Sequence, residues 1–117
     1  MIKLDNERGS ICISSEVITW IAGDAATRCF GVKGMAGRAK DNGLVQLLRR
    51  ESMTKGVNVI LNDDGSITIE LHIVVDHGVN LAALSSSIMN EVSYKVSSAT
   101  DIPVRSVDAY IDSMIID

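Results

Sequence analysis

Histidine and cysteine, the side chains that most often bind zinc, are rare in this chain. The sequence contains two histidines, His72 and His77, and two cysteines, Cys12 and Cys29. No two of them have the close spacing of a structural zinc site, and two cysteines without a CxxC motif are typical of reduced thiols in a cytosolic protein. We therefore predict no metal site and no cofactor.

Two further groups of residues could support catalysis, but neither is specific. The serine run 85–87 falls inside a predicted helix and lacks the G-x-S-x-G turn that exposes a nucleophilic serine. Glu70 could form a carboxylate pair with Asp108 or Asp112 on a predicted open sheet face, where little burial is available to separate two pKa values. The sequence thus predicts no catalytic residue and no enzyme.

Glycines at three-residue spacing, bracketed by cations, form the most distinctive short pattern. Residues 30–38 read FGVKGMAGR, which is neither a Walker A loop nor a G-x-G-x-x-G fingerprint. Gly31 and Gly34 form a GxxG between two predicted helices, a layout similar to that of KH domains, where GxxG clamps a nucleic-acid backbone. In this interpretation Lys33, Gly34 and Arg38 are the candidate anion or nucleic-acid contacts.

The same glycines have a simpler interpretation in terms of backbone conformation. Gly31 occupies the position where a glycine commonly ends a helix in the left-handed conformation. Gly34 and Gly37 would then form a tight link, with Val32 and Met35 turned toward the core. We favour this interpretation and keep KH-like nucleic-acid binding as the alternative.

Length and composition describe one acidic globular domain. The chain has 117 residues, 46% of them hydrophobic, and a single proline, which argues against a disordered or linker-rich protein. Its net charge of −4 disfavours nucleic acid as a partner. The N-terminus has no apolar run, and the apolar runs elsewhere are too short to span a bilayer. We predict a soluble, cytoplasmic single domain at 1–117, with a loose N-terminus at 1–8 and no direct membrane insertion.

Periodicity places one strand and two helices in the first half of the chain. Residues 10–14 alternate and predict a short strand, after which Ser14 or Ser15 can cap a helix. The apolar positions of this helix continue at helical spacing to Phe30. A second, shorter helix is predicted after Asp41, and its apolar face would carry Leu44, Leu47 and Leu48.

In the second half the period changes to that of strands. Residues 57–62 and 67–76 alternate on either side of an Asp- and Gly-rich turn, which predicts a β-hairpin. Asn80 is expected to cap a long helix, and residues 104–115 to form the last strand. The polar face of these strands should meet water and carries Asn58, Thr68, Glu70, His72, Asp108 and Asp112.

The predicted order of elements is therefore β-α-α-β-β-α-β. It describes an α+β, two-layer domain with a three- to four-stranded mixed sheet and helices on one face. The second hairpin strand and the last strand are joined through a helix, so we expect them to run parallel.

Several features along the chain form one familiar linear pattern. They are Gly9, the helix start EVITWIA at 16–22, the GVKGM element at 31–35, the alternating hairpin with Gly78 after it, and the strand that begins at Val104. With them the chain resembles the alkaline-shock protein family of Gram-positive bacteria, also called envelope stress response proteins. The similarity extends from Gly9 to the end, and this chain is similar to compact members without long charged tails.

The resemblance implies a non-enzymatic, cytoplasmic scaffold or interaction protein in cell-envelope homeostasis and alkaline stress. It implies protein partners, such as a membrane-anchor protein or a kinase encoded by a neighbouring gene, and membrane association through such a partner. It offers no agreed catalytic residues to transfer. We also expect self-association through a small apolar patch on the outer sheet face, formed by Ile60, Val74, Tyr110 and Met114.

Overall fold

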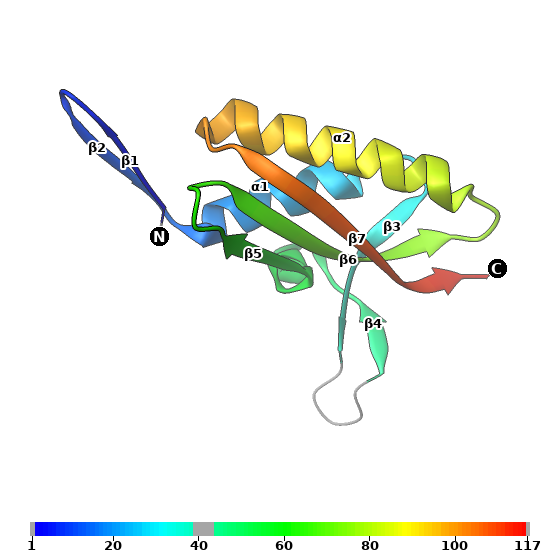
Figure 1. The fold of residues 1–117 in the computed structure, drawn as a ribbon. Helices are drawn as coiled ribbons and strands as arrows, with labels where there is room; N and C mark the ends of the chain where they lie inside the picture. Colours follow the sequence, from blue (N-terminus) through cyan, green and yellow to red (C-terminus); the bar gives the residue numbers. More distant parts are fainter. Residues whose placement is uncertain (1, 39–43, 117) are drawn as a thin grey trace.

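The structure, a computed structural model, describes residues 2–38 and 44–116. Helices cover one side of a mixed sheet (Figure 1), which confirms the predicted α+β, two-layer class. The elements in chain order are β1 (Ile2–Asn6), β2 (Gly9–Ile13), α1 (Ser15–Thr27), β3 (Val32–Arg38), β4 (Val45–Leu47), the 3-10 helix η1 (Arg50–Gly56), β5 (Val57–Leu61), β6 (Ile67–Asp76), α2 (Leu81–Thr100) and β7 (Val104–Ile115).

Strand β6 is the centre of the main sheet. Both β3 and β5 pair antiparallel with it, Met35 opposite Ile73 and Val59 opposite Ile69. Strand β7 pairs with β6 in parallel, and β4 extends the sheet beyond β3. Within the described ranges the main sheet therefore has five strands, more than the three or four predicted. The parallel relation of the last two strands is confirmed.

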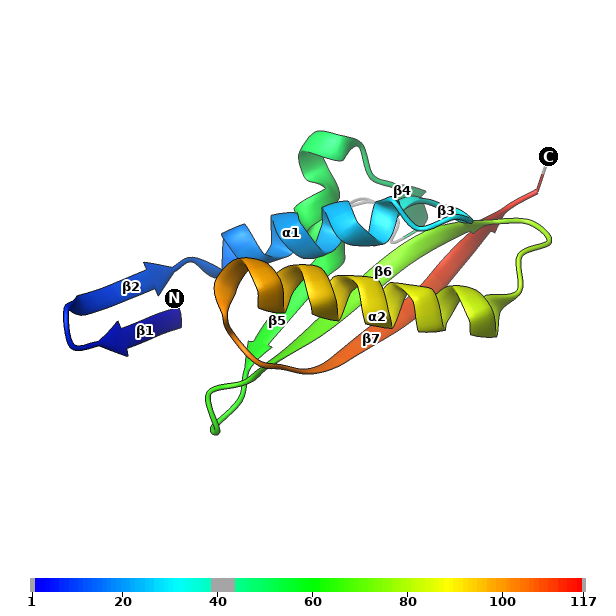
Figure 2. The same ribbon diagram turned by 90° about the horizontal axis from the view of Figure 1, so that it is seen from above.

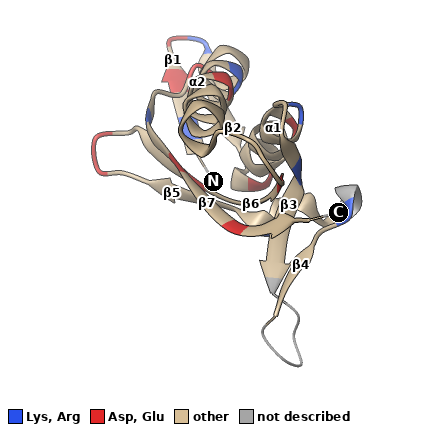
Figure 3. Cartoon of the chain, turned by 90° about the vertical axis from the view of Figure 1, so that its right-hand side faces the viewer, with Lys and Arg blue, Asp and Glu red and all other residues tan. Residues whose placement is uncertain are grey.

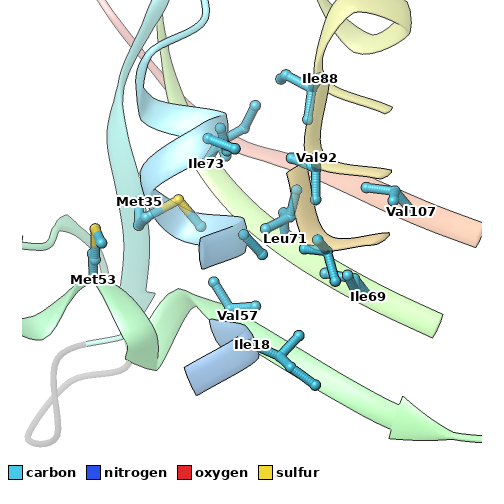
Figure 4. Packing of buried hydrophobic residues seen from close by; sticks show 14 of the residues in the cluster. Ile18, Met35, Met53, Val57, Ile69, Leu71, Ile73, Ile88, Val92 and Val107 are labelled. Carbon is cyan, nitrogen blue, oxygen red and sulfur yellow. The ribbon is translucent and has the colours of Figure 1, made fainter. Parts of the chain in front are cut away.

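The core lies between this sheet and the two helices. Helices α1 and α2 lie side by side over one sheet face (Figure 2), and their inward residues meet the alternating residues of β6 (Figure 4). Ile18 of α1, Val92 of α2 and Leu71 of β6 are fully buried. Because burying one such side chain contributes about 1.5–3 kcal/mol, this aliphatic layer is the main source of stability.

The prediction of a second, shorter helix after Asp41 is wrong. Residues 32–38 form β3 and residues 45–47 form β4, which pair antiparallel, and η1 follows. A Cβ added to Gly34 would lie 2.9 Å from Cδ1 of Leu47, and one on Gly37 would lie 2.7 Å from Cδ2 of Leu48. The leucines that suggested a helical face thus cover the two glycines of β3, a pairing that local periodicity does not reveal. The predicted cap, Asp41, lies outside the described residues.

The N-terminal residues form a hairpin in place of the loose segment expected at 1–8. Strand β1 pairs antiparallel with β2, Leu4 opposite Ile11, and Ile2 belongs to the core cluster. The backbone N–H of Arg8 donates to Oδ1 of Asn6 at 2.8 Å and stabilises the turn. The hairpin is a separate two-stranded sheet that projects from the body of the protein (Figures 1 and 2).

The predicted helix caps are confirmed. Oγ of Ser14 accepts a hydrogen bond from the backbone N–H of Glu16 at 3.2 Å, at the start of α1. Oδ1 of Asn80 accepts from the backbone N–H of Ala83 at 3.0 Å, at the start of α2. Each side chain satisfies a backbone donor that a helix start leaves unpaired.

Helix α1 ends at Thr27, before the predicted end at Phe30. Gly31 follows with a φ of 97°, the left-handed conformation that was predicted for it. A Cβ at this position would lie 2.9 Å from Cγ1 of Val79, so the glycine is also needed for close packing against the segment before α2.

Candidate functional site

A groove of about 730 Å³ lies between the end of α1, the loop from β6 to α2, and the first half of α2. The two helices run side by side there (Figure 2). Val79 and Leu84 supply apolar surface, and Leu84 belongs to the buried core. The residues that line the groove are Arg28, Cys29, Phe30, Asp76, His77, Gly78, Val79, Asn80, Ala83, Leu84, Ser87 and Glu91.

Phe30 is the most unusual residue of the groove. Its side chain is 95% exposed, although it lines the groove and is the single phenylalanine of the chain. Helical periodicity placed Phe30 on the buried face of α1, and that prediction is wrong. The helix ends before it, and the turn at Gly31 directs the chain into β3. The signal available in the sequence was the glycine that immediately follows.

Cys29 lines the same groove and is partly buried. Its thiol Sγ contacts the backbone carbonyl oxygen of Ala25 at 3.5 Å. Burial, and then the negative charge of Glu91, raise the pKa of the Cys29 thiol above its ordinary value. The thiol therefore stays protonated near neutral pH, which is the opposite of what a nucleophilic cysteine requires.

Both basic and acidic side chains line the groove. Nε of Arg28 lies 3.0 Å from Oδ2 of Asp24, and Nζ of Lys95 lies 3.9 Å from Oε1 of Glu91. Figure 3 shows basic residues in blue and acidic residues in red along α2 and around the end of α1. Exposed pairs of this kind contribute little to stability.

The residues of the glycine pattern do not form an open turn between helices. Nζ of Lys33 lies 3.5 Å from Oδ1 of Asp76, in an ion pair between β3 and β6. Gly34 is buried within β3, and Arg38 ends that strand, with its side chain outside the described residues. The layout of helix, GxxG and helix that suggested a KH domain is therefore wrong, because a strand follows the first helix.

The outer face of the sheet carries a polar network. Nδ1 of His72 lies 2.9 Å from Oδ2 of Asp112, and the rings of His72 and Tyr110 stack with centroids 4.8 Å apart. The Tyr110 hydroxyl donates to Oε2 of Glu70 at 3.4 Å, and Nδ2 of Asn58 donates to Oε1 of Glu70 at 2.9 Å. The polar face was predicted to carry Asn58, Glu70, His72 and Asp112, and that placement is confirmed. The pairing of His72 with Asp112 was not predicted, since the pattern of a single strand does not give the register of β7 against β6.

The predicted apolar patch on this face is only partly exposed. Ile60, Tyr110 and Met114 are exposed, but Val74 is 3% exposed, so its inclusion was wrong. Val74 pairs with Gly34 across β3 and β6, and Leu47 approaches Gly34 and covers this part of the face. Polar side chains of β6, among them Glu70 and His72, lie between Ile60 on β5 and Tyr110 on β7.

The network makes a testable prediction about Tyr110. The charge of Glu70, then partial desolvation and the charge of Asp108, raise the pKa of the Tyr110 hydroxyl. In a Tyr94→Phe background, which leaves one tyrosine, Glu70→Gln is expected to lower the pKa of Tyr110. Ultraviolet absorbance during alkaline titration measures the change. Unchanged titration would contradict the assigned role of Glu70.

The same shift has a consequence for stability. The native state holds the Tyr110 proton more tightly than the unfolded state does. The stability gained from this proton is therefore complete at a pH below the pKa of Tyr110 in the unfolded chain. It is lost as the pH rises through the native pKa. Stability should therefore fall less steeply in this alkaline range for Glu70→Gln than for its parent, measured by urea unfolding across the same pH values.

No cluster of three or more metal-binding side chains is found in residues 2–38 and 44–116. Neither helix within these ranges combines the length and apolar character needed to cross a bilayer.

The sequence model of the alkaline-shock protein 23 family, described as having a cell envelope-related function, matches residues 3–116. The chain belongs to this family. The match confirms the resemblance drawn from the sequence. It includes the groove and the outer sheet face, so both belong to the family domain.

The relatives of this alkaline-shock family member match it over nearly its whole length. The uncharacterized protein YloU of Bacillus subtilis strain 168 is 33% identical over 114 residues, which cover 97% of this chain and 94% of YloU. The uncharacterized protein Spy1614 of Streptococcus pyogenes serotype M6 is 32% identical over 115 residues, which cover 97% of this chain and 93% of Spy1614. The uncharacterized protein YqhY of Bacillus subtilis strain 168 is 32% identical over 114 residues, which cover 95% of this chain and 83% of YqhY. No solved structure is significantly similar to the chain.

Proposed function

We propose that this chain is a non-enzymatic, cytoplasmic scaffold in cell-envelope homeostasis and alkaline stress, which acts by binding other proteins. The observation that carries the proposal is the match to a family with a cell envelope-related function over residues 3–116. The structure supports it with an apolar groove beside an exposed aromatic residue, Phe30. Aromatic side chains on a hollowed apolar surface are the usual anchors of protein interfaces.

The chemistry of the groove supports binding more than catalysis. The thiol of Cys29 has a raised pKa, and Glu91, which contributes to that shift, stands beside it. On the outer face, the side chain of His72 in the His72–Asp112 pair is 42% exposed, so the pair lacks the water-excluded surroundings in which catalytic charges act strongly. In the scaffold proposal the proteins bound are envelope components, among them a membrane-anchor protein.

The experiment is a crosslinked co-purification from the native cell. The tagged chain, expressed at its normal level and crosslinked before lysis, is expected to recover cell-envelope or membrane-anchor proteins over an untagged control. Mass spectrometry identifies the proteins, and the nucleic acid in the same eluate is measured with and without high salt. Recovery of no envelope protein would overturn the scaffold role, and salt-sensitive recovery of RNA or DNA would replace it with nucleic-acid binding.

A further inference from the structure

We propose that the groove binds Phe30 of a second copy of this chain, so that two copies exchange their Phe30 side chains across a two-fold axis. The inference deepens the proposed interaction function by naming a partner surface and its occupant. It starts from two observations on one face of the molecule: an exposed aromatic side chain and an apolar groove beside it.

The backbone holds Phe30 in its exposed position. The N–H of Cys29 donates to the carbonyl of Ala26 at 3.1 Å, and the N–H of Val32 donates to the carbonyl of Cys29 at 3.2 Å. The carbonyl of Gly31 accepts from the N–H of Asp76 at 2.8 Å, which ties the turn to the end of β6. Since the backbone is hydrogen-bonded on both sides of Phe30, only the rotamer of the ring has to be ordered when it meets a partner. A fixed backbone lowers the entropy cost of binding and so favours Phe30 as an anchor.

The groove is suited to receive an aromatic ring. Val79 and Leu84 give it apolar surface, and the helix side is formed by small exposed residues, Ala83 and Ser87, one helical turn apart. A volume of about 730 Å³ leaves room for a ring and the backbone that carries it. Phe30 of the same chain does not fill this space, since its side chain is 95% exposed.

Symmetry makes a second copy the best occupant. A two-fold interface requires that one surface carry both complementary parts, because each residue contact occurs twice. Phe30 and the groove lie side by side on one face, so a single rotation can insert both rings at once. An unrelated protein would have to provide its own cavity for Phe30 as well as a group for the groove.

Charge also favours a second copy. Arg28 stands on the α1 side of the groove, while Asp76 and Glu91 stand on the loop and α2 sides. A two-fold axis that runs along the groove sets the α1 side of one copy against the opposite side of the other, so that Arg28 faces carboxylates. A small polar ligand has less support, because no buried side-chain N or O atom lacks a partner among the described residues.

Sedimentation velocity on the purified chain tests the proposal, from low to several hundred micromolar. The wild type is expected to form dimers, and Phe30→Ala to raise the dissociation constant at least about tenfold, since both anchors are lost. Tyr94→Ala is the matched control, because Tyr94 is an exposed aromatic residue of α2 outside the groove. A monomeric wild type, or equal weakening by both variants, would overturn the proposal.

Blocking the groove gives an independent test. Ser87→Trp should fill the groove and abolish dimers, whereas Ser98→Trp places the same side chain at an exposed site of α2 outside it. Circular dichroism verifies that each variant is folded. Phe30→Ala keeps an open groove and Ser87→Trp keeps its phenylalanine, so their mixture should form heterodimers at concentrations at which neither variant associates alone. A mixture no more associated than its components would overturn reciprocal insertion.

The two proposals can fail separately. A purified chain that stays monomeric overturns the Phe30 exchange and leaves the envelope role untouched. A dimer that recovers no envelope protein from the cell overturns the scaffold role and leaves the exchange standing.

Discussion

Replacing Ile73 by alanine is expected to lower the free energy of unfolding by about 3–5 kcal/mol, close to the upper end for buried isoleucine. Ile73 is 0% exposed and lies on β6, the strand that joins β3 to β7. Met35 stands opposite it on β3 and Ile111 on β7, so strands on both sides restrict how far the cavity can close.

The matched control for this substitution is Ile60→Ala. Ile60 is 41% exposed on β5, which lies on the same sheet but on its outer face. Its loss should cost less than about 1 kcal/mol, through lost strand preference and a small buried area. Urea unfolding followed by circular dichroism measures both, at low protein concentration so that association adds nothing. A cost for Ile73→Ala similar to that for Ile60→Ala would contradict the central place of β6 in the core.

The elements that could be predicted from the sequence are those whose signal is local. Strand β6 alternates from Ile67 to Ile73, and its buried side lies against the helices as expected. The caps at Ser14 and Asn80 depend on a side chain that bonds two or three residues onward, so residue type alone indicates them. The same reasoning placed Glu70 and His72 on the water-facing side, where both are found.

The elements that could not be predicted depend on contacts distant along the chain. Strand β3 contains Gly34 and Gly37, which favour no regular element, and it becomes a strand because β4 and β6 pair with it. Phe30 continued a helical pattern, but the periodicity of apolar residues does not indicate where a helix stops. Val74 alternates to the outer face as expected, but it is buried there beside Gly34, against which Leu47 packs. Residues 30–38 therefore serve mainly to position the groove and the edge of the sheet.

Gly56→Ala is expected to destabilise the fold by about 2 kcal/mol, through a conflict with backbone atoms. A Cβ at Gly56 would lie 2.9 Å from the carbonyl oxygen of Ala36, 3.0 Å from Cβ of Met35 and 3.3 Å from the carbonyl oxygen of His72. These atoms belong to β3 and β6, so relief requires a shift of strands rather than of a side chain. Reduced freedom of the unfolded chain offsets only about 0.4–1 kcal/mol.

Gly23 provides a control, because replacing it by alanine is not expected to lower the free energy of unfolding. A Cβ at Gly23 in α1 would meet Cγ and Sδ of Met53 at 3.5 Å and Cγ2 of Val57 at 3.6 Å, which are ordinary contacts. Alanine is favoured over glycine inside a helix by about 1 kcal/mol, so Gly23→Ala should leave stability unchanged or raise it. Chemical unfolding of both variants tests the pair. If Gly56→Ala is as stable as Gly23→Ala, the end of η1 does not pack against β3 and β6 as closely as described.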